Sequence, residues 1–253
     1  MPSSNHPHPS PSIPAKDSSD PEPAPVIVAL DAMDESDALA LARALAGRVW
    51  GFKIHDLLFR AGVEVVPRLK HYGKVFCDHK LFDIPQTVAN KVRVLAEGGA
   101  DLITLHCSGG EAMLRAARKA RQEVNPQMSL LGVTVLTSFS DADSRNLFGR
   151  TAAGQVRRFA QTALTIPLDG VIVSPAELKL LDRIDPDRRL LRVTPGVRPA
   201  GAPAIRGDDQ QRTLTPSQAI ALGAGLLVIG RPITAAPDPV QACEDILAEL
   251  NSD

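Results

Sequence analysis

The stretch KVFCDHKLFDIPQT, residues 74–87, contains in order an apolar run, a set of charges and a proline. Its first half has the apolar and β-branched character of a buried strand. The charged residues Asp78 and Lys80 lie at the end of that strand, and Asp83 follows just after it. Pro85 suits the first turn of a helix. The stretch therefore predicts a strand, a charged loop and a helix, which together make one β-α unit.

The same pattern recurs along the chain on both sides of this stretch. Strands are expected at 26–31, 51–55, 74–80, 102–107, 130–136, 170–174, 190–196 and 225–230. Helix-like segments separate them, for example at 36–47, 56–73 and 109–123. Near-continuous apolar strands are typical of parallel sheets covered on both faces. Eight such units in roughly 225 residues favour an α/β fold of the closed (β/α)8 TIM-barrel type over an open doubly wound sheet.

The chain divides into two regions of different composition. Residues 1–25 are mostly proline, serine and charged residues, which cannot bury enough apolar surface to fold, so a disordered tail is expected there. The tail has no apolar core of the kind that a secretory signal needs. Residues 26–253 are expected to form the barrel catalytic domain. Within it, 137–151 and 197–215 exceed ordinary loop lengths and are candidate active-site loops or lids.

Composition limits the kinds of partner. The 28 lysines and arginines are balanced by 29 aspartates and glutamates, so there is no basic excess of the kind that nucleic-acid or membrane-surface binding requires. The sequence contains no run of 18 apolar residues, so no membrane span is expected. Cys77, Cys107 and Cys243 are too few and too scattered for a disulfide framework, which favours a reduced, cytoplasmic protein.

Charged residues at the ends of the predicted strands indicate where chemistry takes place. Active sites of such barrels lie at the carboxyl ends of the strands, where this chain carries Asp31, Lys53, Asp78 and Lys80. Side chains alternate along a strand, so the last two point to the same face, into the barrel mouth, while His79 points outward. Charges there are costly unless they are paired or used. An ordinary ion-pair network that closes the strand ends is the alternative interpretation.

A second group of residues suits a phosphate. The apolar run GLLVIGRPIT, 225–234, ends its strand with Gly230 and Arg231, a backbone that a ligand can approach and a guanidinium that can bind phosphate in a bidentate manner. The preceding strand ends in TPGVRP, 194–199, which supplies Arg198. Phosphate sites of barrels are often built by these two loops. A turn glycine beside a solvated arginine is the alternative.

Taken in order, these motifs resemble those of the orotidine 5′-monophosphate decarboxylase family over about residues 26–250. The matching segments are VALD (28–31), DHKLFDIPQT (78–87), HCSGGEAM (106–113), GVTVLTS (132–138), VTPGVRP (193–199), TPSQAI (215–220) and VIGRPIT (228–234). The resemblance implies a TIM barrel that removes CO2 from orotidine 5′-monophosphate to give UMP, with no cofactor and no metal.

The resemblance also implies a role for each candidate residue. Asp31, helped by Lys53, would bind a ribose hydroxyl, Asp78 would face the departing carboxylate, and Lys80 would donate the proton. The family's sites are shared across a homodimer, so Asp83, Ile84 and Thr87 would serve the neighbouring subunit. Thr137 would contact the pyrimidine, Gln210 would bridge base and phosphate, and Arg198, Gly230 and Arg231 would hold the phosphate.

The chain departs from the family pattern after the second strand. The family usually reads KVGxELF there, whereas this chain reads KIHDLLF, so His55 replaces a glycine and Leu57 a glutamate. Two other functions remain open. A magnesium-dependent sugar-phosphate decarboxylase or aldolase of the same barrel family shares the Asp-x-Lys-x-x-Asp pattern. A catalytically inactive nucleotide-binding barrel would be expected to have lost that set, which is intact here.

Overall fold

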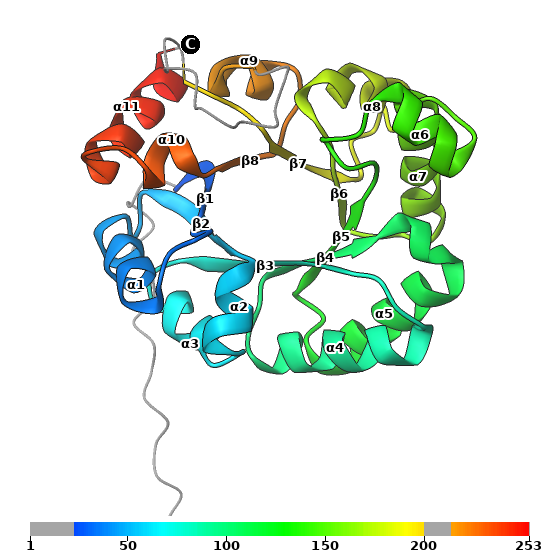
Figure 1. Ribbon diagram of the computed structural model, residues 1–253, viewed down its shortest axis with the longest axis horizontal. Helices are drawn as coiled ribbons and strands as arrows, with labels where there is room; N and C mark the ends of the chain where they lie inside the picture. The colour runs from blue at the N-terminus through cyan, green and yellow to red at the C-terminus, as the bar shows by residue number, and fades with distance from the viewer. Residues whose placement is uncertain (1–22, 200–213, 253) are drawn as a thin grey trace, which may run out of the picture.

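The structure is a computed structural model, which describes residues 23–199 and 214–252. It is a closed barrel of eight parallel strands surrounded by helices (Figure 1). The strands are β1 Ala24–Ala29, β2 Val49–Ile54, β3 Lys74–Leu81, β4 Leu102–His106, β5 Ser129–Val133, β6 Gly170–Ile172, β7 Leu191–Pro195 and β8 Leu226–Ile229. They pair in chain order, and β8 closes on β1 through Ile27 and Val228. The predicted fold class is confirmed.

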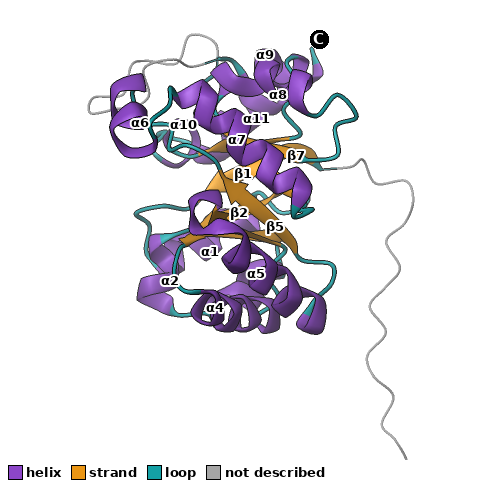
Figure 2. Ribbon diagram, turned by 90° about the vertical axis from the view of Figure 1, so that its right-hand side faces the viewer, coloured by secondary structure: helices purple, strands orange, loops and turns teal. Residues whose placement is uncertain are grey.

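Helices cover the outside of the barrel, as the side view shows (Figure 2). They are α1 Glu35–Ala44, α2 Asp56–Ala61, α3 Val65–Lys70, α4 Pro85–Glu97, α5 Gly110–Val124, α6 Asp141–Phe148, α7 Ala152–Thr165, α8 Leu178–Ile184, α9 Pro216–Ala221, α10 Arg231–Thr234 and α11 Pro239–Asn251. Short 3-10 turns, η1 Cys107–Gly109 and η2 Pro175–Glu177, precede α5 and α8.

The apolar core consists of two clusters, one inside the barrel and one between the strands and the surrounding helices. The smaller fills the barrel with alternate strand residues, namely Ile27, Ala29, Phe76, Leu102, Leu131, Val193, Leu226 and Val228. The larger joins the outward-facing strand residues, such as Val28 and Phe52, to the helices. Because side chains alternate along a strand, any polar residue two positions beyond an inward apolar residue also faces inward. The strand register therefore decides which polar side chains face the barrel mouth.

Several predicted boundaries were wrong. The single helix expected at 56–73 is divided into α2 and α3, because Gly62 between them has φ 73°, a conformation that other residues rarely adopt. The candidate loop 137–151 contains α6, which begins with a capping box at Ser140. The first strand begins at Ala24, inside the expected tail, where Ala24 N donates to Arg48 O at 3.0 Å. Residues 1–22 lie outside the described residues.

Candidate active site

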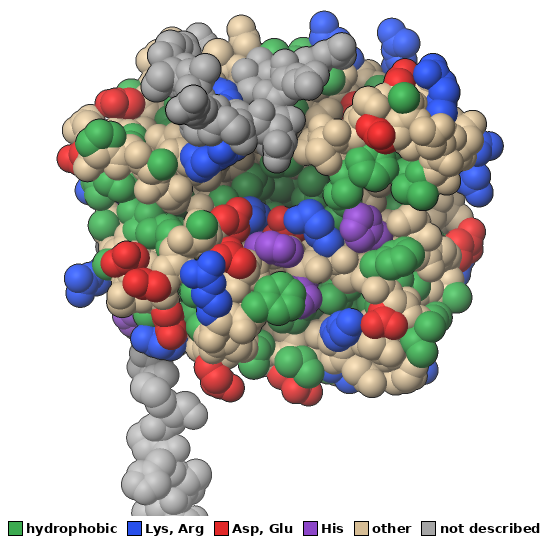
Figure 3. All heavy atoms as spheres, in the orientation of Figure 1, with side chains coloured by type: hydrophobic (Ala, Val, Ile, Leu, Met, Phe, Trp, Pro, Cys, Tyr) green, Lys and Arg blue, Asp and Glu red, His purple; other side chains and the backbone are tan. Residues whose placement is uncertain are grey.

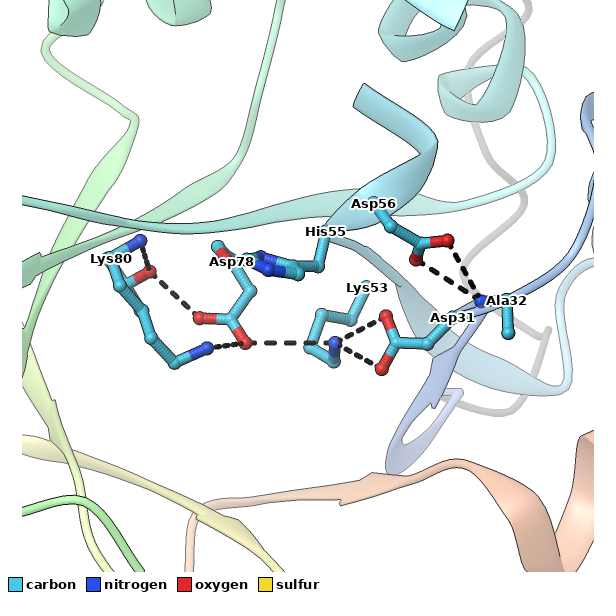
Figure 4. Close-up of polar contacts among 8 residues, drawn as sticks. Asp31, Ala32, Lys53, His55, Asp56, Asp78 and Lys80 are labelled. Atoms are coloured by element: carbon cyan, nitrogen blue, oxygen red, sulfur yellow. Dashed lines mark hydrogen bonds and ion pairs between the residues drawn. The ribbon is translucent and has the colours of Figure 1, made fainter. Parts of the chain in front are cut away.

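Four charged side chains form a continuous chain of ion pairs at the barrel mouth (Figure 4). Lys53 Nζ lies 2.8 Å from both carboxylate oxygens of Asp31 and 3.7 Å from Asp78 Oδ2. Lys80 Nζ lies 2.7 Å from the same Asp78 oxygen. Asp31, Lys53, Asp78 and Lys80, called the charge set below, thus alternate in sign across three neighbouring strands. The structure brings together all four residues that the strand ends predicted.

The strand register explains why these side chains meet. Asp78 follows Phe76 by two positions on β3, and Phe76 belongs to the cluster inside the barrel. Asp31 follows the inward-facing Ala29 in the same way, just after β1 ends. Lys53 lies on β2 between the outward-facing Phe52 and Ile54. The charge set therefore lies on the inner face of the barrel, directly beyond the apolar side chains that fill it and at the carboxyl ends of the strands.

Lys80 has an unusual backbone conformation. Its φ is 46°, in the left-handed region that a residue with a Cβ rarely adopts. The β3–β4 register is irregular between Cys77 and Leu81, which brackets this residue. Thr104 of β4 holds this irregular segment of β3, because its hydroxyl accepts from Lys80 N at 2.9 Å and donates to Asp78 Oδ1 at 2.9 Å. Such strained positions cluster at functional sites, where surrounding contacts fix them.

Burial and charge together set the ionisation of Asp78. Asp78 and Lys53 are 9% and 7% exposed. Burial raises the pKa of the Asp78 carboxyl, but the charges of Lys53 and Lys80 and the hydrogen bonds from Lys80 and Thr104 outweigh it, so the pKa stays below its usual value. The carboxylate is held charged beside the ammonium of Lys80, an arrangement that is typical of functional sites.

The sequence analysis missed three residues around the charge set. Thr104 is fully buried, and it could have been found because it follows the inward-facing Leu102 by two positions. His55 Nδ1 lies 2.7 Å from the carbonyl oxygen of Asp78. Asp56 accepts from the backbone N–H of Ala32 with both carboxylate oxygens, each at 3.2 Å. Neither of these two contacts has a sequence signal, since each depends on how α2 meets the neighbouring strands.

The DIPxT part of the motif lies apart from the charge set of its own chain. Asp83 is exposed and pairs with Lys91 at 3.0 Å. That hydrogen bond, together with one from the backbone of Ile84, holds the pKa of Asp83 below its usual value. Ile84 precedes α4 and is 67% exposed, and Thr87 lies in the first turn of α4. Asp83 and Ile84 are therefore exposed on the surface of a single chain, and Thr87 is half-buried beside them.

A pocket of about 500 Å3 lies on the opposite side of the mouth, at the ends of β5, β6 and β7. Thr137 lines it, together with Ser174, Glu177 and Gly196. Burial raises the pKa of the Glu177 carboxyl, although hydrogen bonds from Ser174 oppose this effect. Thr137 thus lies at the rim of the barrel mouth.

The predicted phosphate residues lie on neighbouring strand ends. Gly230 follows β8 and precedes α10, and a Cβ at this position would lie 3.4 Å from the Cβ of Ala29. Arg231 begins α10 and is exposed. Arg198 follows β7, and its backbone N–H donates to Leu214 O at 2.9 Å. Gln210 lies outside the described residues.

The space-filling view shows the mouth as a hollow in this face of the molecule (Figure 3). Acidic, basic and histidine side chains gather at its edge over β1 to β4. His79 stacks on Phe59 with ring centroids 4.9 Å apart, and His106 meets Phe82 edge-on at 5.9 Å. In the described ranges, no cluster of three histidine, cysteine or acidic residues could hold a metal ion, and no helix is long and apolar enough to cross a membrane.

Known proteins resemble this chain over nearly its whole length. A sequence profile of the orotidine 5'-phosphate decarboxylase / HUMPS family matches residues 24–246. The orotidine 5'-phosphate decarboxylase of Dichelobacter nodosus is 42% identical over 84% of this chain and 93% of that protein. That of Dictyoglomus turgidum is 43% identical over 86% of this chain and 91% of that protein. The crystal structure of the Lactobacillus acidophilus orotidine 5'-phosphate decarboxylase covers 92% of this chain and 100% of its own, with a TM-score of 0.76 and 36% identity.

Proposed function

The chain belongs to the orotidine 5'-phosphate decarboxylase / HUMPS family, and from this premise we propose the residue roles by which it converts orotidine 5′-monophosphate to UMP and CO2. This reaction is the last step of de novo pyrimidine nucleotide synthesis. The observation that carries the proposal is the charge set, in which Lys80 Nζ lies 2.7 Å from Asp78 at the barrel mouth.

The proposed chemical step uses placed charge. The bond between ring carbon 6 and the carboxylate breaks, CO2 leaves, and the electron pair stays on carbon 6. The ammonium of Lys80 stabilises this negative charge and then transfers a proton from Nζ to carbon 6, which completes UMP. Lys80 regains its proton from solvent. The negative charge on carbon 6 develops only as the transition state is approached. Its attraction to Lys80 therefore stabilises the transition state more than the bound substrate, which lowers the activation free energy.

Asp78 and Lys53 are proposed to hold the charged groups in place for proton transfer. Asp78 is held as a carboxylate, so it orients the Lys80 ammonium through the 2.7 Å hydrogen bond and faces the departing carboxylate. Lys53 neutralises Asp78 from the other side and holds Asp31, whose exposed carboxylate is proposed to accept a ribose hydroxyl. A site that is already charged and ordered needs little rearrangement during the reaction.

Contacts remote from carbon 6 are proposed to supply binding energy. Thr137 lines the pocket at the end of β5 and would contact the pyrimidine. Arg198, Gly230 and Arg231 follow β7 and β8 and would hold the phosphate, with Gln210 bridging base and phosphate. Such binding energy can be used to order the reacting groups, so that phosphate-free substrates would lose turnover as well as affinity.

We further propose that two copies of the chain form a homodimer with shared sites. Asp83, Ile84 and Thr87 lie outside their own charge set, and Asp83 would complete the neighbour's site. Large apolar side chains are exposed on the loops and helices beside the mouth, with Phe59 72%, Phe82 60% and Ile84 67% exposed. Exposed apolar groups of this kind are typical of an interface.

The cytoplasm is the proposed location of the protein. The three cysteines are all free and buried, with burial raising the pKa of the Cys77 and Cys107 thiols to about 12. Free cysteines are typical of proteins in a reducing compartment. A role in nucleotide synthesis supports the same location.

The first test is the absorbance change on adding orotidine 5′-monophosphate to the purified protein in the presence of EDTA. Conversion to UMP by the wild type, and not by Lys80→Ala, would support the reaction and the role of the lysine. Tight UMP binding without turnover by the wild type would contradict the proposed activity. Activity that requires added Mg²⁺ and a keto-sugar phosphate would assign the chain to the magnesium-dependent branch instead.

Subunit mixing tests the shared site. Lys80→Ala and Asp83→Ala homodimers are each expected to be inactive, because each lacks one residue in both sites. A mixed dimer contains one site with both native residues, so unfolding and refolding the two variants together should recover activity. Separate refolding of each variant is the control. Mixed dimers that stay inactive would show that Asp83 acts within its own subunit.

A further inference from the structure

The first two residues after β2 contact two segments that carry three members of the charge set, namely the turn at Asp31–Ala32 and the irregular part of β3 at Asp78–Lys80. His55 reaches the carbonyl of Asp78 on β3, and Asp56 reaches the backbone N–H of Ala32 beside Asp31 (Figure 4). Both segments contain a residue in the left-handed region, Ala32 with φ 60° and Lys80 with φ 46°. Each contact therefore supports a backbone segment that is costly to form and that places a charged side chain of the site.

The contact of His55 has a defined direction. A carbonyl oxygen can only accept, so at 2.7 Å the Nδ1 atom of His55 must carry the hydrogen and donate it. The paired residues of β2 and β3 end at Ile54 and Cys77, the residues directly before His55 and Asp78. The imidazole thus holds β3 at the point where the backbone pairing of these strands stops. Thr104 holds the same segment of β3 from its other side, on β4.

The contact of Asp56 is longer but twofold. Both carboxylate oxygens accept from Ala32 N at 3.2 Å, and Arg60, one helical turn later, pairs with Asp56 at 2.8 Å. Asp31 comes immediately before Ala32, and its carboxylate is otherwise held by Lys53. Asp56 therefore fixes the main chain beside Asp31, while Lys53 fixes its side chain.

We propose that His55 and Asp56 are positioning residues for two different parts of the reaction. His55 holds the Asp78–Lys80 segment of β3, on which proton transfer depends, and Asp56 holds the Asp31 turn, on which ribose binding depends. Neither residue touches the reacting atoms. His55 stands where the family usually has glycine, and Leu57, which replaces the usual glutamate, is fully buried and brings no polar group to either segment. The inference rests on the proposed roles of Lys80 and Asp31.

Isosteric substitutions separate the hydrogen bonds from the bulk of the side chains. His55→Asn keeps an N–H donor at the position of Nδ1, whereas His55→Leu has a similar shape and no donor. Asp56→Asn keeps an acceptor oxygen for Ala32 N, whereas Asp56→Ala removes it. The measurements are kcat for orotidine 5′-monophosphate, the dissociation constant of UMP and the thermal unfolding midpoint of each variant, beside wild type and Lys80→Ala.

His55→Leu is expected to lower kcat by roughly ten- to a hundred-fold with little change in UMP affinity, because misplacement of a catalytic group by about 1 Å has effects of this size. His55→Asn should stay within a few-fold of wild type. Asp56→Ala is expected to weaken UMP binding by about three- to ten-fold with little change in kcat, as expected for the loss of one hydrogen-bonded support. Asp56→Asn should bind UMP nearly as wild type does.

These outcomes separate the inference from the proposed function. An active wild type with an inactive Lys80→Ala supports the function, and the inference is then overturned if His55→Leu keeps wild-type kcat or if His55→Asn is as impaired as His55→Leu. It is also overturned if the Leu and Ala variants lose kcat and affinity in the same proportion. If His55→Leu fails to fold, His55→Ala serves as the second variant without a donor.

Discussion

Lys80 donates from Nζ to Asp78 Oδ2 at 2.7 Å while its own backbone lies in the left-handed region, with φ 46°. The two residues are separated by one position on β3, and both lie within the segment from Cys77 to Leu81 where the β3–β4 register is irregular. For a residue with a Cβ, this conformation is unfavourable by about 1–2 kcal/mol. The fold accepts this strain in order to hold an ammonium and a carboxylate together at the barrel mouth.

Replacing Lys80 should separate activity from stability. Lys80→Ala and Lys80→Gly are both expected to lose at least about 10⁴-fold in turnover, because each lacks the proton donor and its charge. Lys80→Gly should be more stable than Lys80→Ala by about 1 kcal/mol, since glycine adopts a positive φ without strain. Urea denaturation of the two variants measures the difference. Equal stabilities would show that the left-handed conformation is not retained in solution.

The hydroxyl of Thr104 should support both stability and turnover. Thr104→Val keeps the shape but leaves Lys80 N and Asp78 Oδ1 without this partner, so a loss of about 1–3 kcal/mol in unfolding free energy is expected. Turnover should fall as well, because the backbone at Lys80 loses its hydrogen-bond partner on β4. Thr104→Ser retains the hydroxyl and serves as the control. A valine variant with wild-type stability would contradict the proposed anchoring.

The lowered pKa of Asp78 predicts a defined acid dependence of stability. An aspartate whose pKa is lower in the folded protein stabilises it fully above the ordinary value, about 3.9, and this contribution is lost as pH falls towards the folded value. Unfolding free energy should therefore decline with falling pH below about 4. Asp78→Asn lacks this titration, so its stability should decline less steeply over the same window. Parallel curves for the two proteins would contradict the shift.

Glu177 should oppose folding at neutral pH. Burial raises the pKa of its carboxyl in the folded protein, so its favourable contribution is present below the ordinary pKa and is lost as pH rises through the folded value. Glu177→Gln should therefore be more stable at pH 7, by at most about 1 kcal/mol, because glutamine can retain the capping box with Ser174. The gain should vanish near pH 4, the ordinary range of glutamate. Thermal unfolding at the two pH values provides the test.

The sequence by itself determined the barrel and the members of the charge set. Near-continuous apolar strands require cover on both faces, and the alternation of side chains puts Asp78 two positions and Lys80 four positions beyond the inward-facing Phe76. These are local rules that need only the order of residues. The same rules could have included Thr104, which follows Leu102 in the same register on β4. They did not predict the division of 56–73 into two helices, since the decisive Gly62 lies within an otherwise helical pattern.

Only the tertiary structure decided how the charge set is held. The tertiary structure sets the left-handed φ of Lys80. It also brings Thr104 and His55 against β3 and Asp56 against Ala32, in contacts that join residues 23 to 26 positions apart. Such contacts arise from the closure of neighbouring strands into a barrel and from where α2 begins. No periodicity in the sequence encodes them, because hydrogen bonds between strands depend on register and curvature rather than on local propensity.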